Sequence, residues 1–236
     1  TGTICRENYR QGCSIVDLAH GRFADCTFSD SDGTAPESGV DIEPFRPDHV
    51  VDDIEFRNCT FRDNREHGLV ISLDPAPTAV QANIRVIDSA VFANNDGVLL
   101  FRHARDIAFA GCDIRDNRGR GVIIFSGGRD VQFAGGAISD NGAHGLEAVT
   151  TPNERFSGLE IRNVEMLDNS RGRPGRWDGI HLRNALTDVV IDHCTITGSH
   201  RYGISATDQV RRLHLGDNAM DGNVEGPTNL PATVIW

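Results

Sequence analysis

A repeat built on glycine limits what this chain can fold into. Along the sequence a glycine repeatedly opens a short run of alternating apolar residues, at Gly39, Gly68, Gly97, Gly121, Gly145, Gly179 and Gly203. The intervals between these glycines are 29, 29, 24, 24, 34 and 24 residues. A unit of this size cannot bury its apolar side chains alone, so consecutive units are expected to stack on one another.

Between the glycine-led runs lie further alternating apolar segments that end in a polar turn. They cover residues 54–64, 84–95, 107–117, 131–141, 159–169 and 189–199, and an incomplete earlier copy covers 22–32. Each unit therefore offers three short strands separated by turns, and the 3.6-residue period of a helix is absent throughout.

This pattern predicts an all-β, single-domain right-handed parallel β-helix, a solenoid of about seven or eight coils. The right hand follows from the general preference of parallel connections. We expect one domain over 1–236, with the coils in 22–223. Residues 1–21 would form an N-terminal cap or partial coil, and 224–236 a C-terminal cap.

The cysteines fit a stacked interior. Four of the 6 cysteines occupy one position of the repeat, with Ala90 assigned to the same position in another coil: they are Cys26, Cys59, Cys112 and Cys194. This column predicts small side chains that pack inside the solenoid. The sequence does not decide whether a disulfide forms between Cys5 and Cys13 or between Cys26 and Cys59. The absence of a CxxC spacing argues against a zinc-binding site.

Composition excludes several functions. The chain has no lysine, since all 23 basic residues are arginine, which rules out a Schiff-base lysine or a phosphate-loop lysine. The net charge of −11 argues against nucleic acid as a partner. No apolar run approaches the ~20 residues that span a bilayer. We expect a secreted, extracellular or cell-surface protein whose signal peptide is not present in this chain.

The glycine-led coils with asparagine-bearing turns resemble the pectin-lyase-like superfamily of right-handed β-helix proteins from about Arg22 onward. The resemblance implies lysis, hydrolysis or epimerisation of acidic polysaccharides, or glycan binding by a spike protein. Residues 38–44, Ser-Gly-Val-Asp-Ile-Glu-Pro, resemble the motif of alginate C5-epimerases and related lyases, which runs aromatic, Gly, apolar, Asp, Pro, His, Glu.

That motif implies that Asp41 neutralises a substrate carboxylate or binds calcium. Glu43 stands where the motif has its histidine, and Ser38 or its neighbour stands where it has its tyrosine. The histidine of the next coil, His67, is a candidate for the missing base.

Strand alternation predicts which side chains face outward. Residues one and three after each glycine point into the solenoid, and residues two and four point out. The outward positions form two polar clusters on either side of an apolar patch of Leu99, Phe101, Ile123 and Phe125. In the second cluster Glu147 and His181 should be lateral neighbours on adjacent rungs, as should His144 and Asp178. Histidine–carboxylate pairs of this kind can position an imidazole for proton transfer.

From these ladders we select site residues. The catalytic candidates are His181, Glu147, Asp178, His144, Asp41 and Glu43. The substrate-binding candidates are Arg120, Arg176, Trp177, Arg183, Tyr202, Asp96 and His67. Insertions at 73–82, 150–158 and 170–178 are expected to wall a binding groove, because solenoid insertions commonly gather on the binding face.

The preferred function is an extracellular carbohydrate-active enzyme that acts on a uronic-acid-containing polysaccharide by β-elimination or C5 epimerisation. His181 or His144 would be the base, Tyr202 an acid, and Arg183 or Arg120 would neutralise the substrate carboxylate.

Two alternatives stay open. The first is an inverting glycoside hydrolase that uses Glu147 with Asp178, or Asp41 with Asp96. The second is a non-catalytic glycan-binding β-helix or spike protein. The sequence identifies no cofactor with certainty, although it is compatible with a bound Ca²⁺ ion. It does not identify residues that would bind a metal, the glycan, or the oligomeric state.

Overall fold

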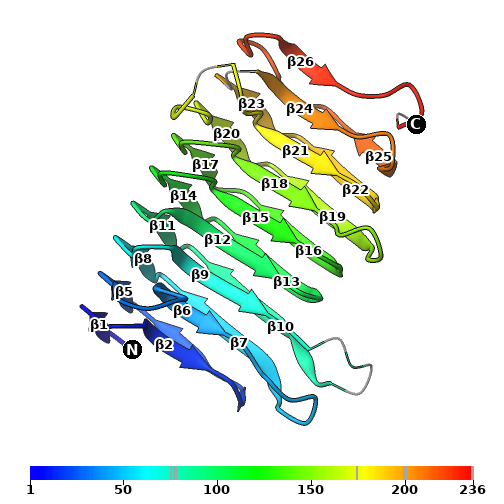
Figure 1. Ribbon diagram of the computed structural model, residues 1–236. Helices are drawn as coiled ribbons and strands as arrows, with labels where there is room; N and C mark the ends of the chain where they lie inside the picture. Colours follow the sequence, from blue (N-terminus) through cyan, green and yellow to red (C-terminus); the bar gives the residue numbers. More distant parts are fainter. Residues whose placement is uncertain (75, 77–78, 174, 199–200, 235–236) are drawn as a thin grey trace.

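The computed structural model describes residues 1–74, 76, 79–173, 175–198 and 201–234. This part of the chain contains 26 strands and no helix. The strands form three parallel sheets of 8, 9 and 9 strands that run the length of the molecule (Figure 1). The predicted all-β, right-handed parallel β-helix is confirmed.

The first sheet consists of β1 Ile4–Arg6, β5 Thr27–Ser29, β8 Thr60–Arg62, β11 Ala90–Phe92, β14 Asp113–Arg115, β17 Ala137–Ser139, β20 Glu165–Leu167 and β23 Thr195–Thr197. The middle sheet consists of β2 Gln11–Ile15, β6 Ser38–Ile42, β9 His67–Ser72, β12 Asp96–Phe101, β15 Val122–Phe125, β18 Leu146–Val149, β21 Ile180–Arg183, β24 Tyr202–Ala206 and β26 Gly226–Asn229. The third sheet consists of β3 Leu18–Ala19, β4 Arg22–Ala24, β7 Val51–Arg57, β10 Gln81–Ile87, β13 Ala104–Ala110, β16 Gly128–Ala134, β19 Phe156–Arg162, β22 Leu186–Asp192 and β25 Arg211–Leu215.

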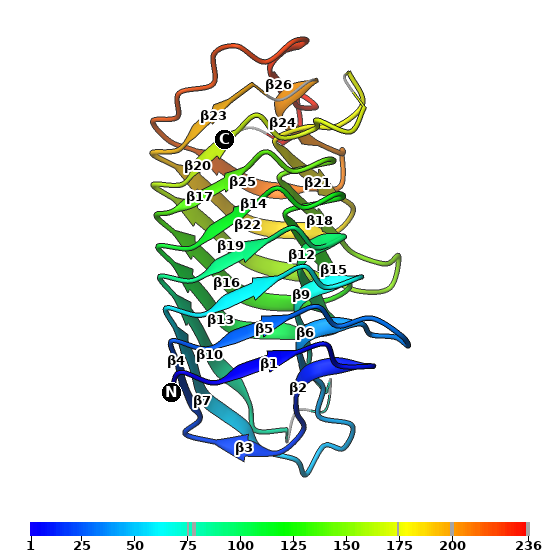
Figure 2. The ribbon, with the colours of Figure 1, turned by 90° about the vertical axis from the view of Figure 1, so that its left-hand side faces the viewer.

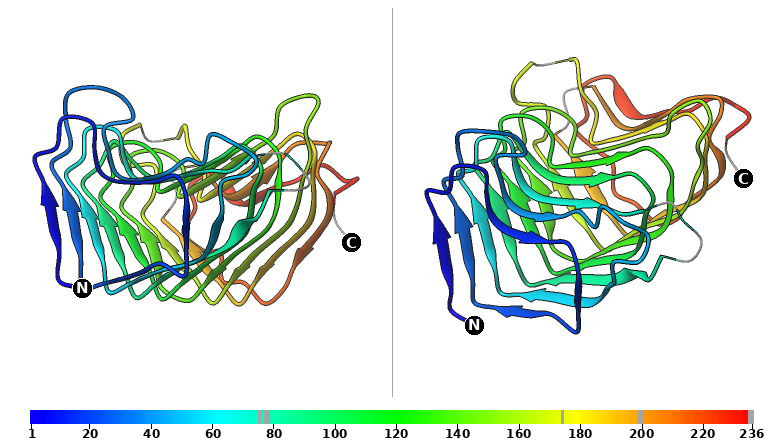
Figure 3. Two further views of the ribbon diagram at one scale, coloured as in Figure 1. Left: turned by 90° about the horizontal axis from the view of Figure 1, so that it is seen from below. Right: turned by 60° about the horizontal axis from the view of Figure 1, so that its bottom comes forward.

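The chain visits the three sheets in turn, so each coil adds one strand to each sheet and lies on the coil before it (Figure 2). The two termini lie at opposite ends of the stack (Figure 3). Residues 1–21 supply β1, β2 and β3, one to each sheet, and β26 extends the middle sheet at the other end.

The interior is lined as the alternation predicts. Residues one and three after the lead glycines are buried: Val40, Ile42, Leu69, Ile71, Val98, Leu100, Val122, Ile124, Leu146, Ala148, Ile180, Leu182 and Ile204. Equivalent side chains of successive coils stack directly, as in Phe109 and Phe133, whose ring centroids lie 4.9 Å apart at an interplanar angle of 7°. Burial of these apolar columns supplies most of the driving force for stacking.

A ladder of buried asparagines holds one corner of the coils. Asn64, Asn94, Asn117, Asn141 and Asn169 are each no more than 1% exposed. In every step the side-chain Oδ1 accepts hydrogen bonds from both the backbone N–H and the amide Nδ2 of the preceding ladder residue. The Nδ2 group also donates to a main-chain carbonyl of the coil before. All of these amide groups are therefore paired without water.

The ladder explains the glycine repeat. A Cβ atom on Gly121 would lie 2.8 Å from Nδ2 of Asn141 and 2.7 Å from the carbonyl oxygen of Gly145. The same two neighbours, an asparagine Nδ2 and a glycine carbonyl of the next coil, crowd Gly39, Gly97 and Gly145. A glycine is required at these positions because the asparagine amide fills the space that a side chain would need.

The cysteine column is confirmed, with one change of register. Cys26, Cys59, Cys112 and Cys194 are all buried. Ala90 pairs with Thr60 and Asp113, so Ser89, and not Ala90, occupies the column position in its coil.

The disulfides that the sequence left open are not formed, since all six cysteines are free thiols. In the column the thiols instead approach main-chain carbonyls, for example Cys26 Sγ at 3.3 Å from the oxygen of Ala24.

Two of the three insertions project at the same edge of the middle sheet. Residues 73–74, 76 and 79–80 and the segment 150–155 each follow a middle-sheet strand, β9 or β18, and precede a strand of the third sheet (Figure 1). The insertion at 170–178 instead leads from β20 into β21, at the opposite edge. No helix in the described part of the chain is long and apolar enough to span a membrane.

Replacing one ladder residue tests this account of the fold. We expect Asn117→Ala to lower the free energy of unfolding by about 3 kcal/mol or more, because it leaves several buried polar groups of the neighbouring coils unpaired. Urea denaturation measures the change. Asn153→Ala, which removes an exposed loop amide, is the control and should stay within about 0.5 kcal/mol of the wild type. Equal stability of both variants would contradict a supporting role for the ladder.

Candidate functional site

The candidate site lies on the outer face of the middle sheet. The residue before each lead glycine and the second residue after it both project there, from β18, β21 and β24. Backbone pairing sets Glu147 beside His181 and His181 beside Ser205. His144 and Asp178 precede these strands. Four of the catalytic candidates are thus brought together, as the ladders predicted.

His181 is held by a hydrogen-bonded relay. Its Nδ1 lies 2.6 Å from Ser205 Oγ, which lies 2.5 Å from Asp178 Oδ2. A carboxylate only accepts hydrogen bonds, so the Ser205 hydroxyl donates to Asp178 and accepts the proton on His181 Nδ1. The Nε2 atom of His181 is therefore left with its lone pair. An imidazole oriented in this way is suited to act as a base.

Asp178 is the fixed charge behind this relay. It is completely buried. Arg201 donates to both of its carboxylate oxygens, and the backbone N–H of Tyr202 donates to Oδ1 at 3.2 Å. Burial alone would raise the pKa of Asp178, but the hydrogen bonds from His181, Arg201 and Ser205 outweigh it and hold the pKa well below its usual range. Asp178 is thus an ionised positioning residue.

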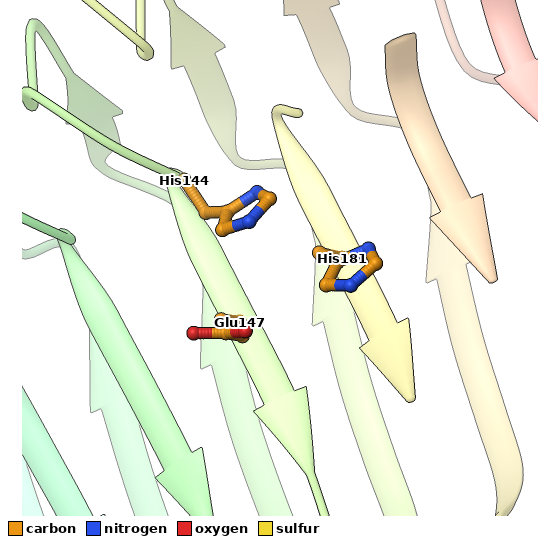
Figure 4. Close-up of side chains that lie close together, drawn as sticks. All are labelled: His144, Glu147 and His181. Atoms are coloured by element: carbon orange, nitrogen blue, oxygen red, sulfur yellow. The ribbon is translucent and has the colours of Figure 1, made fainter. Parts of the chain in front are cut away.

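His144 is a neutral hydrogen-bond donor. Its Nδ1 accepts a hydrogen bond of 2.9 Å from the backbone N–H of Asp178, so the single proton of the neutral ring is on Nε2. The ring stacks on His181 with centroids 4.8 Å apart (Figure 4) and meets Trp177 edge-on at 5.0 Å. Burial, and then the neighbouring His181, lower the pKa of His144 to about 4. His144 therefore keeps its Nε2–H donor uncharged at neutral pH.

Glu147 and Arg120 form an ion pair at the edge of the imidazoles. Arg120 Nε lies 2.5 Å from Glu147 Oε2, and the Arg120 guanidinium also lies 3.8 Å from Asp96. Asp96 further accepts the backbone N–H of Arg120 at 2.6 Å. Arg183, on β21, is exposed and has no ion pair among the described residues. Arg183 is thus the cation of this cluster that is left to meet an anionic ligand.

The cluster does not fit a metal ion. His144, Glu147 and His181 do place one ligand atom each within 4.8 Å of one another. The Nδ1 of His144 is already an acceptor and its Nε2 carries a proton, while Glu147 is paired with Arg120. Free lone pairs remain on His181 Nε2 and on Glu147 Oε1, which Arg120 does not engage, and these are fewer than the three protein ligands that a catalytic zinc site uses. Calcium would need several oxygen ligands, and these three residues include a single carboxylate.

A hollow of about 470 Å³ begins beside this cluster and crosses the sheet towards β9. Its size is that of a small-molecule site. It is lined by His67, Leu99, Phe101, Arg120, Ile123, Phe125, Glu147, Val149 and Arg183. The predicted apolar patch is thus the floor of this hollow, and Phe101 stacks on Phe125 with ring centroids 5.8 Å apart. The two imidazoles stand just beyond its end, on the rungs that carry Glu147 and Arg183.

The first polar cluster, for which the outward ladders select Asp41, Glu43, His67 and Asp96, is divided by the fold. His67 joins the second cluster because it lines the same hollow. Burial lowers the pKa of His67, and the negative charges of Asp96 and Glu66, which would raise it, only partly offset this effect. Asp41 and Glu43 lie elsewhere, on β6 and directly after it.

Asp41 is a buried carboxyl group without a partner. It is 2% exposed, and its Oδ1 has no hydrogen-bond partner among the described residues. Burial, and then the neighbouring Glu43, raise its pKa to about 6. The structure therefore gives Asp41 no contact with the histidine pair.

The remaining candidates border the cluster. Trp177 packs on His144 and carries the Arg176 guanidinium 4.8 Å from its own ring centroid. Tyr202 lies on β24, and a side-chain hydrogen bond with Glu225 raises the pKa of its hydroxyl. A raised pKa makes Tyr202 a weaker acid than it would be alone.

Sequence reasoning did not select Ser205 and Arg201, which complete the relay. Ser205 is the second residue after Gly203 and so lies in the same outward column as His181. This position could have identified it as a neighbour of His181. Arg201 faces Asp178 from the next coil, a contact that the column alone does not specify.

Comparisons with known proteins agree with this fold. Residues 52–220 match a protein-family profile described as a right handed beta helix region. No curated protein sequence matches the chain.

Three solved structures are similar in fold. The Azotobacter vinelandii mannuronan C-5 epimerase AlgE4 A-module has a TM-score of 0.74 at 18% identity, over 92% of this chain and 57% of that one. The AlgE6 A-module of the same organism has a TM-score of 0.56 at 14% identity, over 99% and 80%. The periplasmic alginate epimerase AlgG has a TM-score of 0.62 at 14% identity, over 92% and 50%. The chain thus spans little more than half the length of the AlgE4 module.

The unpartnered Asp41 gives a pH-dependent prediction. Because its folded pKa of about 6 lies above the ordinary 3.8, its contribution favours folding at low pH and is lost as pH rises through 6. Asp41→Asn should therefore stabilise the protein by about 2 to 3 kcal/mol near pH 8 and change little near pH 4. Urea denaturation at both pH values measures the difference. Loss of stability near pH 8 would instead show that a cation pairs with this carboxylate.

Proposed function

The chain belongs to the right-handed beta-helix family, and from that premise we propose that it is an enzyme that removes the C5 proton of a uronic acid within an acidic polysaccharide. The observation that carries the proposal is the relay from Asp178 through Ser205 to His181, which leaves the Nε2 lone pair of His181 as a base. The C5 proton of a uronate lies next to its carboxylate, so a positioned base and stabilisation of that carboxylate are the two requirements of the step.

Each requirement has residues to meet it. The C5–H bond breaks, its proton passes to His181 Nε2, and the electron pair moves into the substrate carboxylate group. Arg183, which has no ion pair among the described residues, supplies positive charge for that group, and Arg120 lines the same hollow in its pair with Glu147. The Nε2–H of His144 supplies an uncharged hydrogen bond at the oxygen where negative charge grows.

C5 epimerisation is the preferred outcome. A proton from water is then delivered to C5 from the opposite face, His181 releases the abstracted proton to solvent, and no bond of the chain is broken. The solved structures that support this outcome are named mannuronan C-5 epimerases and an alginate epimerase. Their low identity makes both the reaction and the uronate a proposal for this chain. One of them is named periplasmic, which supports a location outside the cytoplasm.

β-Elimination is the second candidate, and the side-by-side arrangement of the two imidazoles favours it. His144 and His181 stack with an interplanar angle of 7° on one side of the sheet. In elimination the electron pair forms a C4–C5 double bond, the C4–O4 bond breaks, and the leaving oxygen takes a proton from the newly protonated His181 or from water, while the neutral His144 only donates a hydrogen bond. A base and a donor on the same side of the sugar suit this sequence.

The hydrolase alternative has little support in this geometry. It needs one free carboxylic acid and one free carboxylate. Asp178 has both oxygens engaged by Arg201, and Glu147 is paired with Arg120. In the other pair, Asp96 is engaged by Arg120 and Asp41 is buried.

Exchange of the C5 proton tests the base. Polymannuronate incubated with the protein in deuterated water should gain deuterium at C5, followed by nuclear magnetic resonance. His181→Gln should reduce this exchange by about 100-fold or more, because general-base catalysis contributes that much. His214→Gln, which replaces an exposed histidine on β25, should exchange like the wild type. New ultraviolet absorbance from unsaturated uronate would assign elimination. No exchange and no absorbance with a panel of polyuronates would overturn the proposed reaction.

Ser205→Ala tests the relay separately from the base. Without the hydroxyl, His181 Nδ1 loses its partner at 2.6 Å and keeps only the longer contact of 3.4 Å with Asp178 Oδ2, so its ring is held less firmly. We expect kcat to fall about 10- to 100-fold with little change in KM. Ser205→Thr keeps the hydroxyl and should restore most of the rate, which a packing defect alone would not predict. An unchanged rate in Ser205→Ala would remove the serine from the relay.

A further inference from the structure

Two more hollows continue the site along the edge of the middle sheet. The hollow beside the histidine pair shares Phe101 and Phe125 with a second hollow, which is walled by the insertion at 150–155. The second shares His103 with a third hollow, which lies over the start of β13 and β16. The three therefore follow one another from the outer face of the middle sheet round to the third sheet.

The charge of this path is opposite to that of the whole chain. Its lining includes the six arginines Arg102, Arg105, Arg120, Arg129, Arg155 and Arg183. It includes only the three carboxylates Asp106, Glu147 and Glu154. The chain as a whole has a net charge of −11. A local excess of arginine in such a chain favours an anionic ligand at this place.

Two of the three arginines of the third hollow lack counter-ions, whereas Arg129 is paired with Asp130 and Asp106. Arg155 has no ion pair or side-chain hydrogen bond among the described residues. Arg105 donates to the main-chain oxygens of Asp74 and His103, and no carboxylate pairs with it in the described ranges. Burial, and then the nearby positive Arg129, lower the pKa of Arg105. Like charges held together in a partly buried hollow are stabilised by an anion that enters it.

The acidic groups along the path are already engaged. Glu154 accepts hydrogen bonds from Ser126 and Thr151 and lies 3.7 Å from His103. Asp106 lies 3.5 Å from Arg129. These contacts reduce the repulsion that the carboxylates would exert on a polyanion.

The middle of the path is aromatic. Phe101 and Phe125 stack there, and Phe125 is 39% exposed. The C–H faces of a sugar ring can pack on such a surface. Charge at both ends and an apolar floor between them suit a chain of sugars that carries a carboxylate on each residue.

We propose that an anionic polysaccharide occupies this path from the histidine pair to the third hollow, where Arg105 and Arg155 bind the carboxylate of a distant uronate. The inference rests on the proposed function for the identity of the ligand. It adds a second anion subsite, on a different sheet from the reacting residue, and predicts that the protein distinguishes long chains from short ones.

Binding measurements test the path without any reaction. Titration calorimetry with polymannuronate and with its dimer compares the wild type, Arg155→Gln and Arg211→Gln. Arg211 is an exposed arginine on β25 without an ion pair among the described residues, so this control removes the same charge elsewhere. We expect Arg155→Gln to weaken polymannuronate binding about tenfold, the loss of one charge-assisted contact, and to leave dimer binding and the control unchanged.

Several outcomes would overturn the path. They are equal binding of polymannuronate by the wild type and Arg155→Gln, equal losses for polymer and dimer, or no binding of polymannuronate by the wild type. Equally tight binding of single-stranded DNA of matched charge would assign the arginines to phosphate instead. A length-dependent loss in Arg155→Gln without C5 exchange in the wild type would uphold the path and reject only the proposed reaction.

Discussion

The asparagine ladder and the glycines beside it are the constraint on which the rest of the molecule depends. Each asparagine carboxamide satisfies buried main-chain groups and occupies the place where the middle-sheet strand of the preceding coil would otherwise carry a Cβ atom. The corner of every coil is therefore closed in the same way, and successive middle-sheet strands keep one register. That register brings His144, Glu147 and His181 to adjacent rungs, because outward side chains inherit the alignment of the backbone that bears them.

Much of this could be predicted from the sequence because the fold is periodic. Glycine spacing and strand alternation specify the coils, the buried columns and the outward ladders, so the pairing of Glu147 with His181 follows from counting. Counting does not specify which outward groups bond to one another. The burial of Asp178, its pairing with Arg201 and the tautomers of the two imidazoles depend on side-chain geometry at the corner. The alternation of the strand predicted an exposed side chain for Asp41. It does not predict that this carboxyl group is buried or that its Oδ1 lacks a hydrogen-bond partner among the described residues.

The arginines of the chain fall into two groups, those paired with carboxylates and those without such a partner in the described part of the chain. Most arginines of the chain are paired with nearby carboxylates, as Arg162 is with Asp192 and Arg212 with Asp188, and such surface pairs contribute little to stability. Four arginines along the three hollows depart from this pattern, since no carboxylate of the described residues pairs with Arg102, Arg105, Arg155 or Arg183. A strongly acidic protein can therefore still present a positive path to an acidic sugar chain, and long-range repulsion would be screened at physiological salt.

The chemistry of the proposed site occupies only a few rungs. His144, Asp178, His181 and Ser205 all belong to coils from β18 to β24, whereas the coils from β2 to β6 supply none of these groups. Since a solenoid coil contacts only its neighbours, coils can be gained or lost at the far end without moving the relay. The number of coils in such a solenoid therefore does not determine which reaction it catalyses. Proteins with the same relay could differ widely in length.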